Sequence, residues 1–392
     1  MQKNRKFRWD ATLLVSTFIA LSGILWYGMT ADLRAQEGGT STIYLPFTAC
    51  SDNCPTITPT ATPTPTLESL LPSLTAIYAV TVTDGIQFGA ANIISGTHAA
   101  GGIQATSTVS LPLYLDLYEP VNAPPGKRPV VMWMFGSGFT NITANRKGGF
   151  VPIAQELAAR GYVVISIDYR TAYQNPVVAA QAQPYLQQII APVDNSWVPF
   201  VFTPPLFPYT LTEDQYERAI AAAYDDGLTA LKWIASQAAT RQLDMDRLAL
   251  MGSSSGTTTE NSLAYLSDDI GVTTPKIAAM LHLWGGMDYS RGDGLTEIEA
   301  DEAPLFMIHS INDTAAQGGV DYINAKEMGE RAAAIGLTYE LITLTPDPNG
   351  ITPALQAGSG HGLSQVPILE ALSDNGQTLF QRLVNFANSV LP

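Results

Sequence analysis

The chain has 392 residues, of which 46% are hydrophobic and 14% are charged, and its formal net charge at pH 7 is -15. This length and apolar content are sufficient for one large α/β domain with an appendage. An acidic protein repels phosphate backbones, which argues against nucleic-acid binding, and so small a charged fraction is more usual in exported proteins than in cytosolic ones.

The N-terminal segment predicts export. Four positive charges precede an uncharged run from Ala11 to Met29. In a helix this run would span roughly 28 Å, about the thickness of a bilayer core, with its positive flank in the cytoplasm. The run is long for a signal peptide, and Leu33-Arg34-Ala35 is a poor cleavage site. We interpret residues 1–37 as a signal peptide or a signal-anchor transmembrane helix, and the length favours the anchor.

Residues 38–67 are rich in Thr and Pro and nearly uncharged, which predicts a disordered linker or stalk. Both cysteines of the chain, Cys50 and Cys54, lie in this linker and could close a small disulfide loop in an oxidising compartment. A zinc site would need further ligands, and no His lies nearby. Because residues 68–392 contain no cysteine, a thiol nucleophile is excluded there.

Residues 68–392 begin with strand-like segments. Leu at every second position in residues 111–118 predicts a strand with one buried side. The continuous apolar runs 128–136 and 162–170 predict strands that are covered on both faces. Between them, residues 150–161 predict a short helix that ends at a glycine.

Residues 171–211 follow neither the helical nor the strand period, and contain the aromatic and proline-rich segment NSWVPFVFTPPLFPYTL. A loop of this length inside a compact domain is usually functional or disordered, and its apolar content argues against disorder. We interpret it as a lid-like insert or a wall of the substrate pocket; a packed surface excursion is the alternative.

The rest of the chain alternates between helices and strands. Thr212, with Gln215 three residues later, predicts a helix cap, and the helix extends to about Ala238. The later segments, in chain order, are a strand, a helix, two strands, a helix, a strand and a closing helix: residues 247–253, 256–266, 276–286, 303–310, 320–336, 338–344 and 368–390. This order predicts a mainly parallel sheet flanked by helices, with antiparallel strands at its start.

The segment Gly252-Ser253-Ser254-Ser255-Gly256 fits the pattern G-x-S-x-G, with Ser254 at its centre. In that pattern the serine occupies a tight strand-to-helix turn, and the glycines avoid clashes with the neighbouring backbone. The motif alone is a weak signal, but here it follows an apolar strand and precedes a predicted helix. Ser254 is therefore the candidate nucleophile, and the backbone N–H of Ser255 is a candidate donor to an oxyanion hole.

A serine nucleophile needs a base, and the chain has four histidines. His98 lies well before the motif, whereas His282 and His309 lie within or at the end of apolar strands, where a hydrogen-bonded core histidine is the default interpretation. His361 lies in a glycine-rich loop between the last strand and the closing helix. A loop residue can approach the nucleophile from another element, so His361 is the candidate base.

The base needs a carboxylate to orient it, expected between nucleophile and base in chain order. Asp313 follows the strand at 303–310, at the sheet edge where Ser254 should also emerge. Asp321 is the rival, but we expect it at the start of the next helix. The order Ser254, Asp313, His361, each after a different strand, predicts a Ser-His-Asp triad.

The oxyanion hole needs a second donor from the loop after an earlier strand. The loop that follows the strand at 128–135 contains Gly136-Ser137-Gly138, in which small side chains let backbone N–H groups approach an acyl oxygen. A simple glycine turn is the alternative.

The segments LYLDLYEP, PVVMWMFGSGF, GYVVISIDYR, DDGLTALKWI and DRLALMGSSSG resemble, over about residues 105–390, the α/β-hydrolase superfamily and its carboxylesterase/lipase-like branch with an H-G-G-G-F-type oxyanion loop. The resemblance implies an α/β-hydrolase fold, with a mostly parallel sheet flanked by helices. It assigns the nucleophile, acid and base to Ser254, Asp313 and His361, and the oxyanion donors to Ser137, Gly138 and Ser255. The chain departs from the pattern at three positions: Phe135 replaces the loop's usual histidine, Ser137 replaces its middle glycine, and Ser255 stands where the branch often has alanine.

The resemblance predicts a serine hydrolase that cleaves carboxylic esters through an acyl-enzyme, with no metal or organic cofactor, and the N-terminal segment predicts that this hydrolase is exported. Its substrate would be a small-molecule or polymer-linked ester, and an uncleaved N-terminal helix would hold it in the membrane. Three alternatives remain open: a peptidase or amidase, an acyltransferase, and a non-catalytic surface-binding protein.

Overall fold

The computed structural model describes residues 40–43, 72–99, 102–140, 145–189, 212–287, 297–313, 321–344, 361, 368–370 and 373–391. The predicted N-terminal membrane segment, both cysteines and the second half of the predicted insert lie outside the described residues. No helix in the described part of the chain is both long enough and apolar enough to span a bilayer.

The described residues form a sheet of nine strands in the order β1-β2-β3-β5-β4-β6-β7-β8-β9. Adjacent strands are parallel from β5 to β9, whereas β1, β2 and β3 pair antiparallel, as does β3 with β5. The predicted mainly parallel sheet with antiparallel strands at its start is therefore confirmed. The strands are β1 (Thr40–Ile43), β2 (Val80–Ala99), β3 (Gly102–Pro120), β4 (Arg128–Met134), β5 (Val163–Ile167), β6 (Leu243–Ser253), β7 (Ala279–Leu283), β8 (Leu305–Ser310) and β9 (Tyr339–Leu344).

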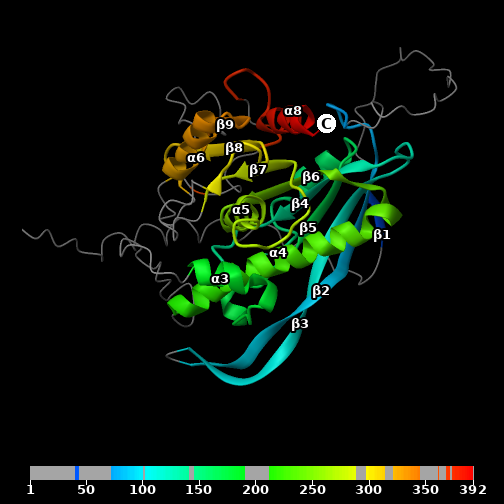
Figure 1. Cartoon of the computed structure of the whole chain (residues 1–392). Helices are drawn as coiled ribbons and strands as arrows, with labels where there is room; N and C mark the ends of the chain where they lie inside the picture. The colour runs from blue at the N-terminus through cyan, green and yellow to red at the C-terminus, as the bar shows by residue number, and fades with distance from the viewer. Residues whose placement is uncertain are drawn as a thin grey trace, which may run out of the picture. The chain divides into compact units, whose positions relative to one another are not determined.

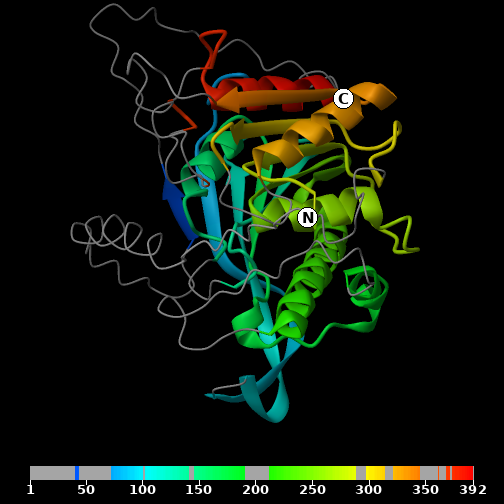
Figure 2. The same ribbon diagram turned by 90° about the vertical axis from the view of Figure 1, so that its left-hand side faces the viewer.

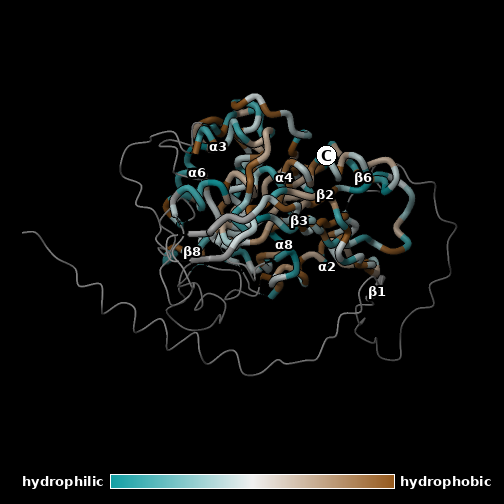
Figure 3. Tube along the Cα trace, turned by 90° about the horizontal axis from the view of Figure 1, so that it is seen from below, coloured by the Kyte–Doolittle hydropathy of each residue, from teal (hydrophilic) through white to brown (hydrophobic). Residues whose placement is uncertain are grey.

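Helices cover both faces of this sheet, and α4 and α8 lie on opposite sides of it (Figures 1 and 2). Hydrophilic and hydrophobic residues both occur along α3 and α6, as expected of helices with one buried face (Figure 3). The α-helices are α2 (Val151–Ala158), α3 (Gln183–Ile189), α4 (Glu213–Arg241), α5 (Ser255–Asn261), α6 (Tyr322–Ile335) and α8 (Leu379–Val390); the short 3-10 helices η2 (Ala172–Gln174) and η3 (Ala180–Ala182) and the π-helical segment η4 (Ser262–Leu266) complete the set.

The central strands supply two hydrophobic cores. In β4, Val130 and Met132 belong to the core that contains buried residues of α4 and α6, whereas Val131 and Trp133 belong to the core that contains buried residues of α2 and α8. Because successive side chains of a strand point to opposite faces, a continuous apolar run is what such a doubly covered strand requires.

The first two long strands form a hairpin that extends past its neighbour in the sheet. β2 and β3 pair from Val80↔Pro120 to Ala99↔Gly102, but β3 pairs with β5 only from Leu115↔Ile167 to Tyr118↔Val164. The distal part of the hairpin therefore extends beyond the carboxyl end of β5, as Figure 1 shows. Residues 111–118, predicted as a strand, are one part of β3, and β2 was not predicted at all.

The sequence also predicts the structure of three other segments. The four described residues of the predicted linker form β1, which pairs with β2. The described first half of the predicted insert, residues 171–189, packs on α4, where the rings of Tyr185 and Tyr224 lie 4.5 Å apart. The closing helix predicted over 368–390 begins only at Leu379, where Thr378 and Gln381 form a capping box; a turn at residues 374–377 precedes it.

Candidate active site

Ser254 occupies a strained turn between β6 and α5. Its backbone has φ 50° and ψ -127°, a region that non-glycine residues rarely adopt. The turn is held by a hydrogen bond from the Ser254 N–H to the carbonyl of Trp284 (3.0 Å) and by one from the Thr257 N–H to the Ser254 carbonyl (2.9 Å). Strain that the surroundings maintain at one serine is typical of a functional turn.

Two glycines let the backbone approach this turn closely. A Cβ atom on Gly256 would lie 2.2 Å from the carbonyl oxygen of Met134, at the end of β4. A Cβ atom on Gly136, in the loop after β4, would lie 2.9 Å from the Cβ of Ser254. The first turn of α5 and the loop after β4 therefore pack directly against the serine, and only glycine fits at both contacts.

The structure brings Ser254, His361 and Asp313 into one hydrogen-bonded chain. The distance from His361 Nε2 to Ser254 Oγ is 2.7 Å, and the distance from His361 Nδ1 to Asp313 Oδ2 is also 2.7 Å. The Asp313 carboxylate, which is buried, can only accept, so Nδ1 carries the proton and Nε2 is free to accept from the serine hydroxyl. This arrangement is able to take the proton from Ser254 during nucleophilic attack.

The topology accounts for this meeting of distant segments. Ser254 follows β6 directly and Asp313 lies just after β8; these parallel strands present their carboxyl ends at one edge of the sheet. His361 lies beyond β9, the next strand of the same sheet. The rival acid, Asp321, caps α6 by accepting from the Asn324 N–H (2.9 Å).

The two strand histidines lie in the core, as expected, but the expected hydrogen bonding is wrong for His282, because neither of its ring nitrogens has a hydrogen-bond partner in the described residues. His282 and His309 are both fully buried, and His309 Nδ1 lies 3.7 Å from Asp313 Oδ2. Burial, and secondarily the neighbouring His309, lowers the pKa of His282 from 6.5 to about 3. His282 is therefore neutral in the folded protein at all ordinary pH values.

We expect this buried histidine to make the fold less stable in acid. Because its folded-state pKa is lowered, its contribution to stability is complete above the unfolded value of 6.5 and is lost as the pH falls toward 3. This amounts to about 2 kcal/mol of unfolding free energy between pH 7 and pH 5. In urea unfolding at both pH values, His282→Met should lose about 2 kcal/mol less than the wild type over this interval. If the wild type and His282→Met lost equal unfolding free energy between pH 7 and pH 5, the lowered pKa of His282 would be contradicted.

Of the three predicted oxyanion donors, one already donates a hydrogen bond within the protein. The N–H of Ser137 donates to Ser255 Oγ (2.8 Å), so this predicted donor is engaged in the structure. In the described part of the chain, neither the Gly138 N–H nor the Ser255 N–H has an acceptor. Of the three predicted groups, Gly138 and Ser255 are thus the two available to a negatively charged oxygen.

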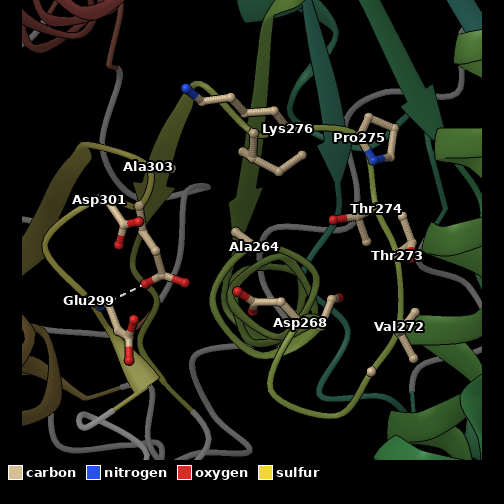
Figure 4. A pocket seen from close by; sticks show the side chains of 14 residues that line it. Ala264, Asp268, Val272, Thr273, Thr274, Pro275, Lys276, Glu299, Asp301 and Ala303 are labelled. Atoms are coloured by element: carbon tan, nitrogen blue, oxygen red, sulfur yellow. Dashed lines mark hydrogen bonds between the residues drawn. The ribbon is translucent and has the colours of Figure 1, made fainter.

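A separate hollow, whose lining side chains Figure 4 shows, lies among residues that precede β7 and β8. This cavity of about 460 Å³ is lined by the segments that precede β7 and β8, whereas Ser254 and Asp313 follow β6 and β8. Its lining includes Glu302, whose pKa burial and the nearby acidic side chains raise to about 8. The cavity is therefore not part of the serine site. Among the described residues, no group of three or more His, Cys, Asp or Glu side chains is placed to hold a metal ion.

Comparisons with known proteins give two family matches. The model described as "alpha/beta hydrolase fold" matches residues 216–324, and the model "BD-FAE" matches residues 115–189. None of the curated proteins compared with the chain matches it.

Solved structures similar to this chain include esterase 2 of Thermogutta terrifontis in several states. The form phosphorylated by paraoxon is 17% identical to this chain and has a TM-score of 0.47. The match covers 71% of this chain and 87% of the esterase chain. The form phosphonylated by cyclosarin has 16% identity and a TM-score of 0.48, with coverages of 71% and 87%. The propionate-bound form has 15% identity and a TM-score of 0.47, with coverages of 71% and 88%.

Proposed function

We propose that this chain, an esterase-like α/β hydrolase, cleaves carboxylic esters with Ser254 as nucleophile, His361 as general base and Asp313 as the acid that orients it. The observation that carries the proposal is the hydrogen-bonded chain from Ser254 Oγ through His361 to Asp313, with 2.7 Å at each step. The strained turn at Ser254 and the match to the alpha/beta hydrolase fold model support it.

The reaction would proceed in two halves. Ser254 Oγ attacks the ester carbonyl while its proton passes to His361 Nε2, and the imidazolium is stabilised by the buried Asp313 carboxylate. The tetrahedral oxyanion accepts hydrogen bonds from the Gly138 and Ser255 N–H groups, each worth about 3–4 kcal/mol in such sites. His361 then gives its proton to the departing alcohol. A water activated by His361 releases the acid and restores the serine.

The proposed substrate is a carboxylic ester, small or attached to a polymer. The solved relatives are described as esterases, one of them with propionate bound, and this favours esters for the present chain. A peptidase or amidase would use the same three residues, and an acyltransferase would pass the acyl group to an acceptor other than water.

We further propose that the enzyme acts outside the cytoplasmic membrane, because four positive charges precede the uncharged run Ala11–Met29. Digestion of the protein by a protease added to intact cells would test this location.

The full chain should hydrolyse 4-nitrophenyl acetate and react covalently with a fluorophosphonate probe. Mass spectrometry of the labelled protein should place the phosphonyl group on Ser254, because only this serine is bonded to an imidazole in the described residues. Turnover of a peptide anilide measured in parallel separates an esterase from a peptidase. A protein that neither hydrolyses the ester nor reacts with the probe is not a serine hydrolase.

A further inference from the structure

We propose that three hydroxyl groups, those of Tyr169, Ser137 and Ser255, form a clamp that positions the oxyanion loop, residues 135–139, and leaves the Gly138 N–H free for the substrate. This inference rests on the proposed function, because it concerns how the same site stabilises the oxyanion. These three residues are positioning residues: the clamp acts on the loop backbone and not on the substrate.

The clamp is centred on Tyr169, which follows β5 and is buried. Its hydroxyl donates to the carbonyl of Phe135 (2.6 Å) and lies 2.9 Å from Ser137 Oγ and 3.2 Å from Ser255 Oγ. Burial raises the pKa of Tyr169, so the hydroxyl keeps its proton. With that proton on the Phe135 carbonyl, the tyrosine oxygen accepts from both serine hydroxyls.

Each serine oxygen, in turn, accepts from the loop backbone. Ser255 Oγ accepts from the Ser137 N–H (2.8 Å), and Ser137 Oγ accepts from the Phe139 N–H (3.0 Å). The assignment uses every hydroxyl proton once, and each of the three oxygens accepts at least one hydrogen bond. A fully satisfied polar network of this kind holds its members rigidly.

The clamp selects which amide remains for the substrate. The Gly136 N–H donates to Ser253 Oγ (3.0 Å) and the Thr140 N–H to the Ser137 carbonyl (3.2 Å), while the clamp engages those of Ser137 and Phe139. In the described residues, Gly138 is thus the one position from 136 to 140 whose N–H has no acceptor. Its φ of 58° belongs to the left-handed region, so the loop turns at the free donor.

The clamp is built at the three positions where the chain departs from the family pattern, two in the oxyanion loop and one in the nucleophile motif. Phe135, in place of the usual histidine, has no polar side-chain atom, and its ring stacks on Tyr169 with 4.2 Å between centroids and 13° between planes. Ser137 and Ser255, the other two departures, supply the two serine hydroxyls. Tyr169 is itself fixed through its neighbour, because the Arg170 N–H and guanidinium both bond to the buried Asp226. The three departures therefore form one unit around a tyrosine that the motif does not contain.

Removing the tyrosine hydroxyl tests the clamp. In Tyr169→Phe, we expect kcat for 4-nitrophenyl acetate to fall roughly tenfold or more, with KM changed less than about twofold, because the loss concerns a transition-state contact. The inhibition constant of an alkyl boronic acid, which forms a tetrahedral adduct with the serine, should rise by a similar factor. Tyr162→Phe is the matched control: Tyr162 is equally buried, but its hydroxyl bonds to Asn388.

A second variant and a second measurement complete the test. Ser255→Ala should lower kcat in the same way, and the double variant should be little worse than the worse single one, because both changes open the same network. Amide hydrogen exchange of residues 135–139 should be faster in Tyr169→Phe than in Tyr162→Phe. Equal kcat and equal exchange in these two variants would overturn the clamp. A wild type without esterase activity or probe labelling would overturn the proposed function instead, and the exchange comparison would still decide on the clamp.

Discussion

Ser254→Ala is expected to reduce kcat/KM for 4-nitrophenyl acetate by about a million-fold, to the level left by binding and the oxyanion donors alone. The hydroxyl of Ser254 is the hydrogen-bond partner of His361 Nε2 in the described chain. Alanine removes this oxygen and keeps the backbone, so the strained turn and the fold are retained. The initial rate of nitrophenolate release and the absence of fluorophosphonate labelling are the two measurements.

Ser236→Ala is the control for this experiment. Ser236 is an exposed residue of α4, and its hydroxyl bonds to the carbonyl of Trp233. We expect its activity and its labelling to equal those of the wild type. Residual activity of Ser254→Ala above about 1% of wild type would show that another residue performs the attack, because the loss of a nucleophile leaves far less.

Much of the site follows from local sequence signals. An apolar run followed by G-x-S-x-G predicts a strand, a tight turn and a helix, and the structure has β6, Ser254 and α5 in this order. Asp313 is predictable because it follows a buried strand, and the parallel order of β6, β7 and β8 then brings it to the edge that carries Ser254. Parallel topology thus converts a sequence rule about strand ends into a spatial arrangement.

The features that the sequence did not predict depend on contacts between segments that are far apart in the chain. The Ser137 N–H could be counted as a donor from its position in the loop, but whether it is free depends on the hydroxyl of Ser255, 118 positions away. Tyr169 carries no signal of a role beyond a strand end, because its partners lie on two other segments. The strand β2 was missed because its register shifts near Ile86, Gly89 and Gly96 interrupt the two-residue alternation.

The backbone strain at Ser254 is maintained by the contacts around it. Ser254 has an unfavourable backbone conformation, which costs on the order of 1–3 kcal/mol. The surroundings offset this cost through the hydrogen bond to the Trp284 carbonyl and through close backbone contacts that require Gly136 and Gly256. The turn is thus fixed before any substrate arrives, so no reorganisation is needed during the reaction.

Asp313→Asn is expected to lower kcat by about ten-thousand-fold with an intact fold. The asparagine side chain has nearly the same shape, but its amide can donate to His361 Nδ1, which would then leave the proton on Nε2 and prevent that atom from accepting from Ser254. The negative charge that stabilises the imidazolium is lost as well. Steady-state kinetics on the aryl ester measure the effect, and circular dichroism confirms the fold.

Asp321→Asn provides the matched comparison, because the same substitution is made at the rival acid of the sequence. Asp321 accepts from the Asn324 N–H at the start of α6 and, among the described residues, forms no hydrogen bond or ion pair with His361. Asparagine is nearly as good a helix cap as aspartate, so this variant should keep both its stability and its kcat. If Asp321→Asn lost activity and Asp313→Asn did not, the acid of the triad would have to be reassigned. If both kept full activity, His361 would not need a carboxylate partner, and the orienting role that the 2.7 Å contact assigns to Asp313 would be wrong.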